Sequence, residues 1–298
     1  MFAAADGTVV DPDAGSVLRR SGGHGAPGPA LAQTAAVAPL LARAVALLRC
    51  FTQEQHTLSA RELVERSGIP RSTVHRLIAD LVALGMLSRT SSGRYCVGAL
   101  VWELAQFSEL QLRLRHAAQV HLTRLYDASG ENVFLGVLTT DAPETAEAMY
   151  VGHVRGAQSA PTRAQEGKVF PLLSTAMGAA LAAARTQPWR ERALARMDAR
   201  EVSAVAGGLD GIRRSLTACH RAGYIVQLGE GSVAVAAPIP AGDDFPDAAV
   251  EVVLSPERWD ERSFAILIRD AAQAIAHELR GGRGARYPRD LTKGTAHD

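Results

Sequence analysis

Long donors and short hydroxyls lie close together in one run of this chain, at Arg71, Ser72, Thr73, His75 and Arg76. Arginine donates hydrogen bonds to phosphate oxygens and guanine edges, and serine or threonine can pair with either kind of group. The chemistry that this mixture predicts is hydrogen bonding to nucleic acid.

Covalent or metal chemistry is the competing interpretation, and the reactive side chains are poorly spaced for it. Adjacent residues on a helix point in different directions, so Cys219 and His220 cannot readily form a nucleophile–base pair. His116 and His121 are five positions apart, a poor spacing for one helical face, and we interpret them as surface residues. The sequence also lacks a Gly-x-Ser-x-Gly elbow, a glycine-rich phosphate loop and a metal-spaced histidine cluster. We therefore expect no enzyme activity, no cofactor and no metal site.

The polar run needs a rigid element to carry it, and capping signals indicate a helix just before it. Ser59 and Glu62 have the spacing of a capping box, in which each side chain satisfies a free backbone amide of the other residue. A helix is therefore predicted from about Ala60, and Gly68 ends it because glycine tolerates the left-handed conformation. Pro70 suits the first turn of a second helix, where a missing amide hydrogen costs nothing.

The second helix is predicted to run to about Leu84 and to bury one apolar stripe. The stripe residues recur at three- and four-residue steps and are Val74, Leu77, Ile78, Leu81 and Leu84. The polar run is left on the other surface near the amino end, the part of a recognition helix that meets base edges. We expect DNA contacts at Ser59, Arg71, Ser72, Thr73, His75, Arg76, Arg89 and Arg94.

A hairpin wing is predicted after Gly85. Residues 86–89 and 94–97 indicate two short strands around a Thr-Ser-Ser-Gly turn, and their basic flanks suit phosphate contact. Residues 41–98 contain eight Arg and four Asp or Glu, a difference of plus four, whereas the whole chain has a net charge of +1. The positive charge is thus concentrated where phosphate neutralisation needs it. The alternative is that this module mediates protein–protein or dimer contacts, with its arginines solvated.

Length and composition bound the class of protein. A chain of 298 residues with 47% hydrophobic content has room for two globular domains and tails. The three cysteines, Cys50, Cys96 and Cys219, form no close-spaced pair, which fits a reducing cytoplasm. The amino end lacks a signal-peptide pattern, and no apolar run approaches the roughly 20 residues that span a bilayer. We expect a cytoplasmic protein that does not span a membrane.

The composition changes along the chain predict five segments. They are a disordered tail at 1–34, a winged helix-turn-helix domain at 35–98, a linker helix at 99–111, a second domain at 112–280 and a flexible basic tail at 281–298. A helix at about 41–51 should pack beneath the DNA-reading pair through one face, formed by Leu41, Val45, Leu48 and Phe51.

The second domain alternates helical patterns with β-like runs at about 133–138, 224–226, 233–236 and 250–254. The simplest interpretation is an α+β domain in which helices flank an antiparallel sheet. Ser174 and Thr175 fall in the first turn of an Ala-rich helix, where free amides and the helix dipole favour an anion such as a small carboxylate. On these residues alone, ordinary capping by either hydroxyl is the favoured alternative.

Both halves of the chain resemble the IclR family of bacterial transcription regulators. In the first half the likeness lies at 58–63, 84–87, 93–98 and in Gly-Ile-Pro-Arg-Ser-Thr-Val-His-Arg-Leu at 68–77. In the second half it lies at 171–181, 221–224 and 235–239. Together it covers about 41–280, and the order of the two patterns in one chain is more specific than either alone.

The resemblance implies a winged-helix domain, a linker helix and a GAF-like sensor domain. That sensor domain binds a small-molecule effector and changes the affinity of a dimer or tetramer for operator DNA. Carried over by position, the resemblance borders the effector with Ser174, Thr175, Ala176, Met177, Glu230, Ala234, Val252 and Leu254.

Three departures from the family pattern make the implied pocket less polar. Glu230 is a single acid where relatives often carry several, residues 252–254 are apolar where small hydroxyl residues are common, and Ala234 replaces a frequent cysteine. We therefore expect a repressor whose effector is an organic acid with an apolar or aromatic body. The alternative is a regulator that senses no ligand and responds only to oligomerisation or to a protein partner.

Overall fold

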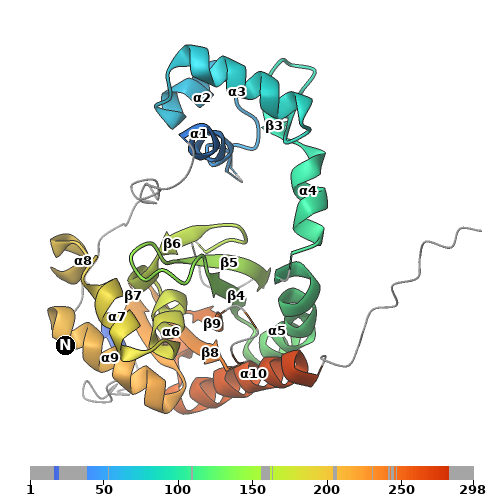
Figure 1. Cartoon of the computed structure of the whole chain (residues 1–298). Coiled ribbons are helices and arrows are strands. Elements are labelled where there is room, and N and C mark those ends of the chain that lie inside the picture. The colour runs from blue at the N-terminus through green and yellow to red at the C-terminus, as the bar shows by residue number, and fades with distance from the viewer. Residues whose placement is uncertain are drawn as a thin grey trace, which may run out of the picture. The chain divides into compact units, whose positions relative to one another are not determined.

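The chain forms two compact units in the computed structural model, which describes residues 17–19, 39–52, 54–108, 110–155, 162, 164–203, 207–229, 231–240, 242, 245 and 247–281. The smaller unit comprises the described residues between 39 and 112. The larger unit comprises 17–19 and the described residues between 113 and 281 (Figure 1). Each unit has its own core of buried apolar side chains. Each is therefore described by itself.

The smaller unit is a winged helix-turn-helix, as predicted. Its elements are α1 (Pro39–Leu48), α2 (Ala60–Ser67), α3 (Arg71–Ala83), β2 (Leu87–Arg89), β3 (Tyr95–Val97) and α4 (Ala99–Gln106). β2 and β3 pair antiparallel and form the wing. The capping box is present, since the Glu62 amide donates to the Ser59 Oγ (3.3 Å) and the Ser59 amide donates to a Glu62 carboxylate oxygen (2.7 Å). Gly68 ends α2 with φ of 64°, which confirms its predicted role.

The core of this unit confirms most of the predicted stripe and corrects two details. Val74, Leu77, Ile78 and Leu81 of α3 are buried, but Leu84 follows the helix and is 64% exposed. The face predicted for the first helix is confirmed in part, because Leu48 and Phe51 pack against the core. Leu41 and Val45 are exposed, and Ala46 and Leu47 are buried in their place. The segment is apolar almost all round, so its periodicity does not identify one face.

The predicted linker helix at 99–111 is shorter than expected. α4 ends at Gln106, and a π-helical segment, η1 (Leu110–Arg115), follows. None of the residues of α4 is buried.

The larger unit is built on a sheet with the strand order β1-β7-β8-β9-β4-β5-β6. Six strands are antiparallel neighbours: β4 (Asn132–Leu138), β5 (Glu147–Val154), β6 (Val169–Pro171), β7 (Ile225–Gly229), β8 (Ser232–Ile239) and β9 (Ala248–Leu254). The predicted α+β class is confirmed. A short edge strand, β1 (Val17–Arg19), pairs parallel to β7, so these three residues depart from the disordered tail expected at 1–34.

Helices cover both faces of this sheet (Figure 1). One face carries α6 (Ala176–Ala184), α7 (Gln187–Leu194) and α9 (Gly208–Ala222), with the short α8 (Ala199–Ser203) leading into α9. The other face carries α5 (His116–Ser129) and α10 (Glu261–Gly281), which pack on each other. Two single turns, η2 (Leu172–Ser174) and η3 (Pro256–Arg258), precede α6 and α10.

Strand register decides which side chains face α6. Glu251 pairs with Ala236 and with Phe134, and Val253 pairs with Ala234, so these residues share one face. That face belongs to the core that contains α6. Val252 and Leu254 alternate with them and point to the opposite face.

Some predicted features lie outside the described residues. They are Glu230, most of the tail at 1–34, and the basic tail beyond Gly281. Among the described helices, none is both long and apolar enough to cross a membrane.

Candidate functional site

The amino-terminal half of α3 displays the polar run identified in the sequence. Arg71, Ser72, His75 and Arg76 are exposed, and Thr73 is half-buried. They stand out from the helix because Val74, Leu77 and Ile78 fix its opposite side in the core. The structure therefore brings these five predicted residues together on one short stretch of helix surface.

The cationic side chains of this surface are not neutralised within the described part of the chain. The side chains of Arg71, Arg76 and Arg89 form no hydrogen bond or ion pair with another described residue. By contrast, Arg61 on α2 is paired with Glu65 one turn later, at 2.8 Å. Unpaired guanidinium groups retain all five donors for an external acceptor such as a phosphate or a guanine edge.

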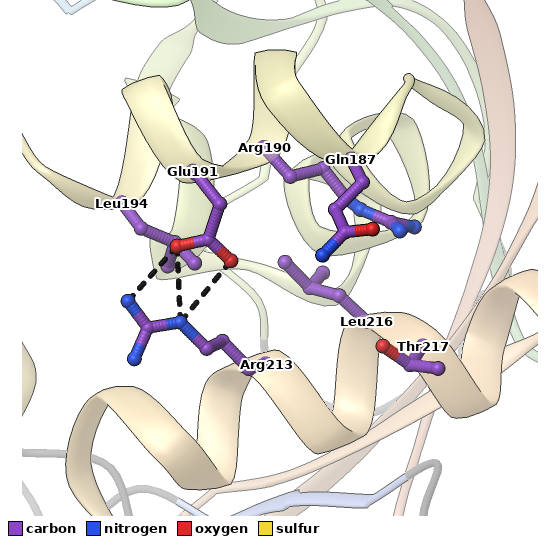
Figure 2. A pocket seen from close by; sticks show the side chains of 7 residues that line it. All are labelled: Gln187, Arg190, Glu191, Leu194, Arg213, Leu216 and Thr217. Atoms are coloured by element: carbon purple, nitrogen blue, oxygen red, sulfur yellow. Dashed lines mark hydrogen bonds and ion pairs between the residues drawn. The ribbon is translucent and has the colours of Figure 1, made fainter.

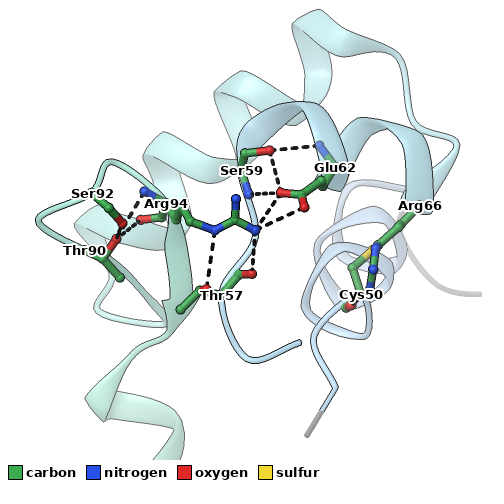
Figure 3. A network of polar contacts seen from close by, with 8 residues as sticks. All are labelled: Cys50, Thr57, Ser59, Glu62, Arg66, Thr90, Ser92 and Arg94. Carbon is green, nitrogen blue, oxygen red and sulfur yellow. Dashed lines mark hydrogen bonds and ion pairs between the residues drawn. The ribbon is translucent and has the colours of Figure 1, made fainter. Parts of the chain in front are cut away.

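Arg94 lies in a different environment from these arginines, although it was predicted with them. Its Nη2 donates to both Glu62 carboxylate oxygens (3.1 and 2.8 Å) and to the Thr57 carbonyl oxygen (2.9 Å), as Figure 3 shows. The guanidinium thus joins the wing to the start of α2. Ser59, also predicted to contact DNA, is the cap of the same network.

Glu62 is the centre of this network. Hydrogen bonds from the Ser59 hydroxyl and amide, together with the Arg94 guanidinium, lower the pKa of Glu62 to about 2. The carboxylate is therefore charged at any physiological pH. Its contacts fix the position of the wing relative to α2, which is a structural role for Arg94.

Four of the predicted effector residues, Ser174, Thr175, Ala176 and Met177, lie at the start of α6. Thr175 is the N-cap, and its hydroxyl accepts from the Gly178 amide at 3.1 Å. The predicted capping role of Thr175 is thus present. The Ser174 hydroxyl is buried and has no partner among the described residues. Ala176 and Met177 are fully buried against the sheet.

A buried carboxyl group that was not predicted occupies the same place. Glu251 on β9 is 2% exposed, and its Oε1 accepts from the Met177 amide at 2.9 Å. Its Oε2 accepts from the Tyr150 hydroxyl at 2.8 Å. Burial raises the pKa of Glu251 from 4.5 to about 7, although both hydrogen bonds act in the opposite direction.

Aromatic rings surround this carboxyl group. The Tyr150 ring meets the rings of Phe134 and Phe170 edge to face, with centroids 5.5 Å apart in both pairs. Burial and the neighbouring Glu251 charge raise the pKa of Tyr150, so its hydroxyl remains a donor. Met177 fills the space above Gly136, where an added Cβ would lie 2.7 Å from the Met177 sulfur.

The structure separates the remaining predicted effector residues. Ala234 packs on the face that carries α6, whereas Val252 and Leu254 lie on the opposite face and do not join Met177. The residue of β9 that does so is Glu251. One signal could have found it, because a glutamate within Val-Glu-Val-Val-Leu is an ionisable group in an otherwise buried strand. Tyr150 gives no such signal.

A separate surface cavity of about 250 Å³ lies between α7 and α9 (Figure 2). Its lining includes Arg213, whose guanidinium binds Glu191 (2.9 Å) and Asp210 (3.0 Å). The positive charge of Arg213 is thus neutralised within the protein. Arg213 is therefore not free to bind an anion in this cavity.

The reactive residues weighed in the sequence are not arranged for catalysis. Burial raises the pKa of Cys219 to about 12, so the thiol stays protonated. The neighbouring His220 ring lies with its Nδ1 3.1 Å from the Ala183 carbonyl oxygen. Within the described residues, no group of three or more His, Cys, Asp or Glu is placed to hold a metal ion.

Each of the two units matches a domain of a known protein family. Residues 40–91 match the IclR helix-turn-helix domain, and residues 108–277 match the bacterial transcriptional regulator IclR C-terminal domain. The HTH-type transcriptional regulator KipR of Bacillus subtilis is 26% identical over 80% of this chain and 95% of its own length. The glycerol operon regulatory protein of Streptomyces coelicolor is 28% identical over 82% of this chain and 97% of its own length.

A solved structure resembles most of the chain. It is an IclR homologue from Microbacterium hydrocarbonoxydans in complex with 4-hydroxybenzoate, with a TM-score of 0.72 and 26% identity, covering 81% of this chain and 99% of its own. Proteins of this kind are transcription regulators rather than enzymes. The helix-turn-helix with its wing, the sheet with its helices and the matches over both units have one conclusion: the chain belongs to the IclR family of DNA-binding transcriptional regulators with a carboxyl-terminal effector-binding domain.

Proposed function

We propose that this regulator is a cytoplasmic repressor that reads a specific operator through α3. The observation that carries the proposal is the row of exposed side chains with unpaired guanidinium groups at the amino end of that helix. Arg71 and Arg76 have the reach for guanine edges, and Ser72, Thr73 and His75 add shorter polar groups. Arg89 on the wing is suited to a phosphate contact.

The experiment that tests this proposal is capture of fragmented source DNA by the purified full-length protein at near-physiological salt. A sequence-specific repressor should enrich fragments that share a short site, because base contacts add to the salt-dependent phosphate term. Symmetric subunits read related half-sites, so the site should be roughly palindromic. Retention of fragments without a shared site would contradict specific recognition.

The proposed effector site lies between the start of α6 and the sheet face that holds Tyr150 and Glu251. Buried ionisable groups with shifted pKa values are candidates for functional sites, and this is the one such carboxyl group for which the described residues give a raised pKa. The aromatic rings around it support an effector with an apolar or aromatic body, and the related regulator in complex with 4-hydroxybenzoate supports an organic acid. 4-Hydroxybenzoate is the ligand of that relative, and we propose an organic acid of this kind for the present chain.

Effector control is proposed to act by linkage. An effector that prefers one arrangement of the paired subunits shifts the population of the DNA-competent state, and operator DNA must change effector affinity by the same factor. Thermal stabilisation by a panel of aromatic and aliphatic acids tests effector binding, since a ligand of the folded state raises its stability. The absence of any shift would favour the alternative regulator that senses no ligand.

Self-association is proposed through the apolar residues that the smaller unit leaves exposed. Trp102 and Phe107 of α4 and its cap are 72% and 71% exposed, and Leu41 and Val45 of α1 are exposed as well. Large apolar side chains gathered on a small unit are typical of an interface. Replacing Trp102 and Phe107 with Ser should shift the protein toward monomer in sedimentation velocity, whereas replacing the exposed Ile266 of α10 should not. An unchanged sedimentation coefficient would exclude α4 from the interface.

A further inference from the structure

The linker that leaves the smaller unit has few fixed points before it reaches the larger unit. No residue of α4 is buried, and the chain then widens into the π-helical turns of η1, a rare form that is frequent at functional sites. Of the side chains that the structure describes after α4, Leu114 is the first buried one, at 1% exposed. The end of η1 is therefore where the larger unit first fixes the linker.

An ion pair sets the direction of the chain at this point. Arg115, the last residue of η1, donates from its Nη1 to Oε1 of Glu166. The other carboxylate oxygen of Glu166 lies 3.5 Å from Nδ1 of His153 on β5. Burial of Leu114 is non-directional, whereas an arginine–carboxylate contact fixes an orientation. Glu166 thus joins the end of the linker to the sheet, and we call Arg115, His153 and Glu166 the linker clamp.

The turn that carries Glu166 is bound to the backbone of β5. This turn precedes β6, and its Gly167 amide donates to the Tyr150 carbonyl oxygen at 2.7 Å. In return the Tyr150 amide donates to the Lys168 carbonyl oxygen at 2.9 Å. Gly167 has φ of 83°, a left-handed conformation that glycine adopts without strain. A displacement of β5 would therefore carry Glu166 with it.

The linker clamp lies where it can open without unfolding the larger unit. The side chains of Arg115, Glu166 and His153 are 36%, 32% and 32% exposed, so water competes for their charges. An ion pair of this exposure contributes little to the stability of a fold. The clamp therefore connects a strand of the core with the end of the linker through a contact that is specific in direction and weak in energy.

We propose that the linker clamp is a conformational latch of this regulator. While the clamp is closed it fixes the end of the linker, and when it opens the linker and the DNA-binding unit gain freedom. Glu166 is a positioning residue of the latch, because it acts through Arg115 and not on DNA. The consequence for operator affinity rests on the proposed DNA binding, whereas the latch itself does not depend on it.

Hydrogen exchange of the full-length protein tests the latch without DNA and without an effector. Glu166→Gln should speed amide exchange in residues 107–116 at least about fivefold, because the end of the linker loses its directed contact. Exchange in β8 and the thermal midpoint should keep their wild-type values. The matched control is Glu191→Gln, which breaks a similarly exposed pair with Arg213 on α9 and should leave residues 107–116 unchanged.

A double-mutant cycle tests whether the two charged partners act through one contact. Arg115→Gln should accelerate exchange as much as Glu166→Gln does, and the double variant should exchange no faster than either single variant. Unchanged exchange in both single variants, or multiplied effects in the double variant, would overturn the latch. Equal acceleration in β8 would overturn it as well, because Glu166 would then stabilise the whole unit.

The consequence for DNA is measured by anisotropy on a captured operator fragment. Glu166→Gln should weaken binding at least about threefold, because a freer DNA-binding unit loses more conformational entropy when it binds. Glu191→Gln should bind as the wild type does. Unchanged affinity of Glu166→Gln, together with faster exchange in the linker, would overturn control of DNA binding by the latch. If the wild type captures no fragment, the proposed operator recognition fails, and the exchange experiment still decides the latch.

Discussion

The start of α3 and the start of α6 use similar side chains in opposite ways. On α3 the hydroxyls and guanidinium groups are mostly exposed, and the guanidinium groups have no partner among the described residues. On α6 the Thr175 hydroxyl and the Met177 amide are paired within the chain, the latter with a glutamate from a distant strand. The polar groups of a DNA-binding surface can stay exposed because water satisfies their hydrogen bonds until DNA binds.

A buried site for a small ligand cannot rely on water to satisfy its polar groups. A buried polar group without a partner costs about 1–3 kcal/mol, so the fold supplies partners of its own. Glu251 and Tyr150 are those partners here. The candidate DNA site is thus displayed on one helix, whereas the proposed effector site is assembled from a helix start and several strands whose polar groups pair with one another.

The largest effect expected from this difference is on the pH dependence of stability. The pKa of Glu251 is raised from 4.5 to about 7, so between these pH values the folded protein keeps a proton that the unfolded chain releases. Wild-type stability should therefore fall as the pH rises from about 4.5 to about 7, by up to about 3 kcal/mol. Chemical denaturation between pH 5 and pH 8 should show this fall in the wild type and its loss in Glu251→Gln.

The matched control for that series is Glu257→Gln, which changes an exposed glutamate of η3 in the same unit. It should keep the wild-type dependence on pH. If the wild type and Glu251→Gln have the same dependence of stability on pH, folding does not change the pKa of Glu251. The contrast with α3 would then fail.

A smaller loss is expected when the packing beneath α6 is disturbed. In Gly136→Ala the new Cβ would lie 2.7 Å from the sulfur of Met177, which is fully buried. We expect a cost of about 1–2 kcal/mol in the free energy of unfolding, at the lower end for overpacking because methionine is flexible. In the background of Met177→Ala the same change should cost less than half as much. Additive losses in this double-mutant cycle would show that the two residues do not compete for space.

The smallest effect is expected in the DNA-binding unit, where the structural Arg94 can be compared with the exposed Arg89. Arg94→Lys should lower stability by no more than about 1 kcal/mol, because the pair with Glu62 is partly exposed. It should leave the slope of log affinity against log salt unchanged. Arg89→Ala, the matched change on the exposed part of the wing, should reduce that slope by about 1. Equal changes of slope in both variants would assign Arg94 to the phosphate backbone.

Local signals explain why the smaller unit could be predicted so far. The Ser59–Glu62 capping box, the left-handed Gly68 and the stripe from Val74 to Leu81 are all encoded within a few residues of where they act. The prediction failed at Leu41 and Val45 for the same reason, since this segment has no local signal for which apolar side is buried.

The proposed effector site could be predicted only in part, because it depends on contacts between distant residues. Thr175 and Met177 are found from the helix that they begin, but Glu251 is 74 residues beyond Met177 and Tyr150 is 101 residues before Glu251. Strand register decides whether Glu251 or Val252 faces α6, and a shift of one residue exchanges the two faces. That register is set by the whole sheet and is not written in β9 alone.

The most direct test of displayed recognition on α3 is an anisotropy titration on a captured operator fragment. It compares the wild type, the double variant Arg71→Ala with Arg76→Ala, and Arg61→Ala, which changes another exposed arginine that is paired with Glu65 on α2. Loss of two base contacts should weaken the double variant at least about 30-fold, with an unchanged thermal midpoint, while Arg61→Ala stays within about threefold of the wild type. Equal affinities for all three proteins would contradict the account and return α3 to the status of a scaffold helix.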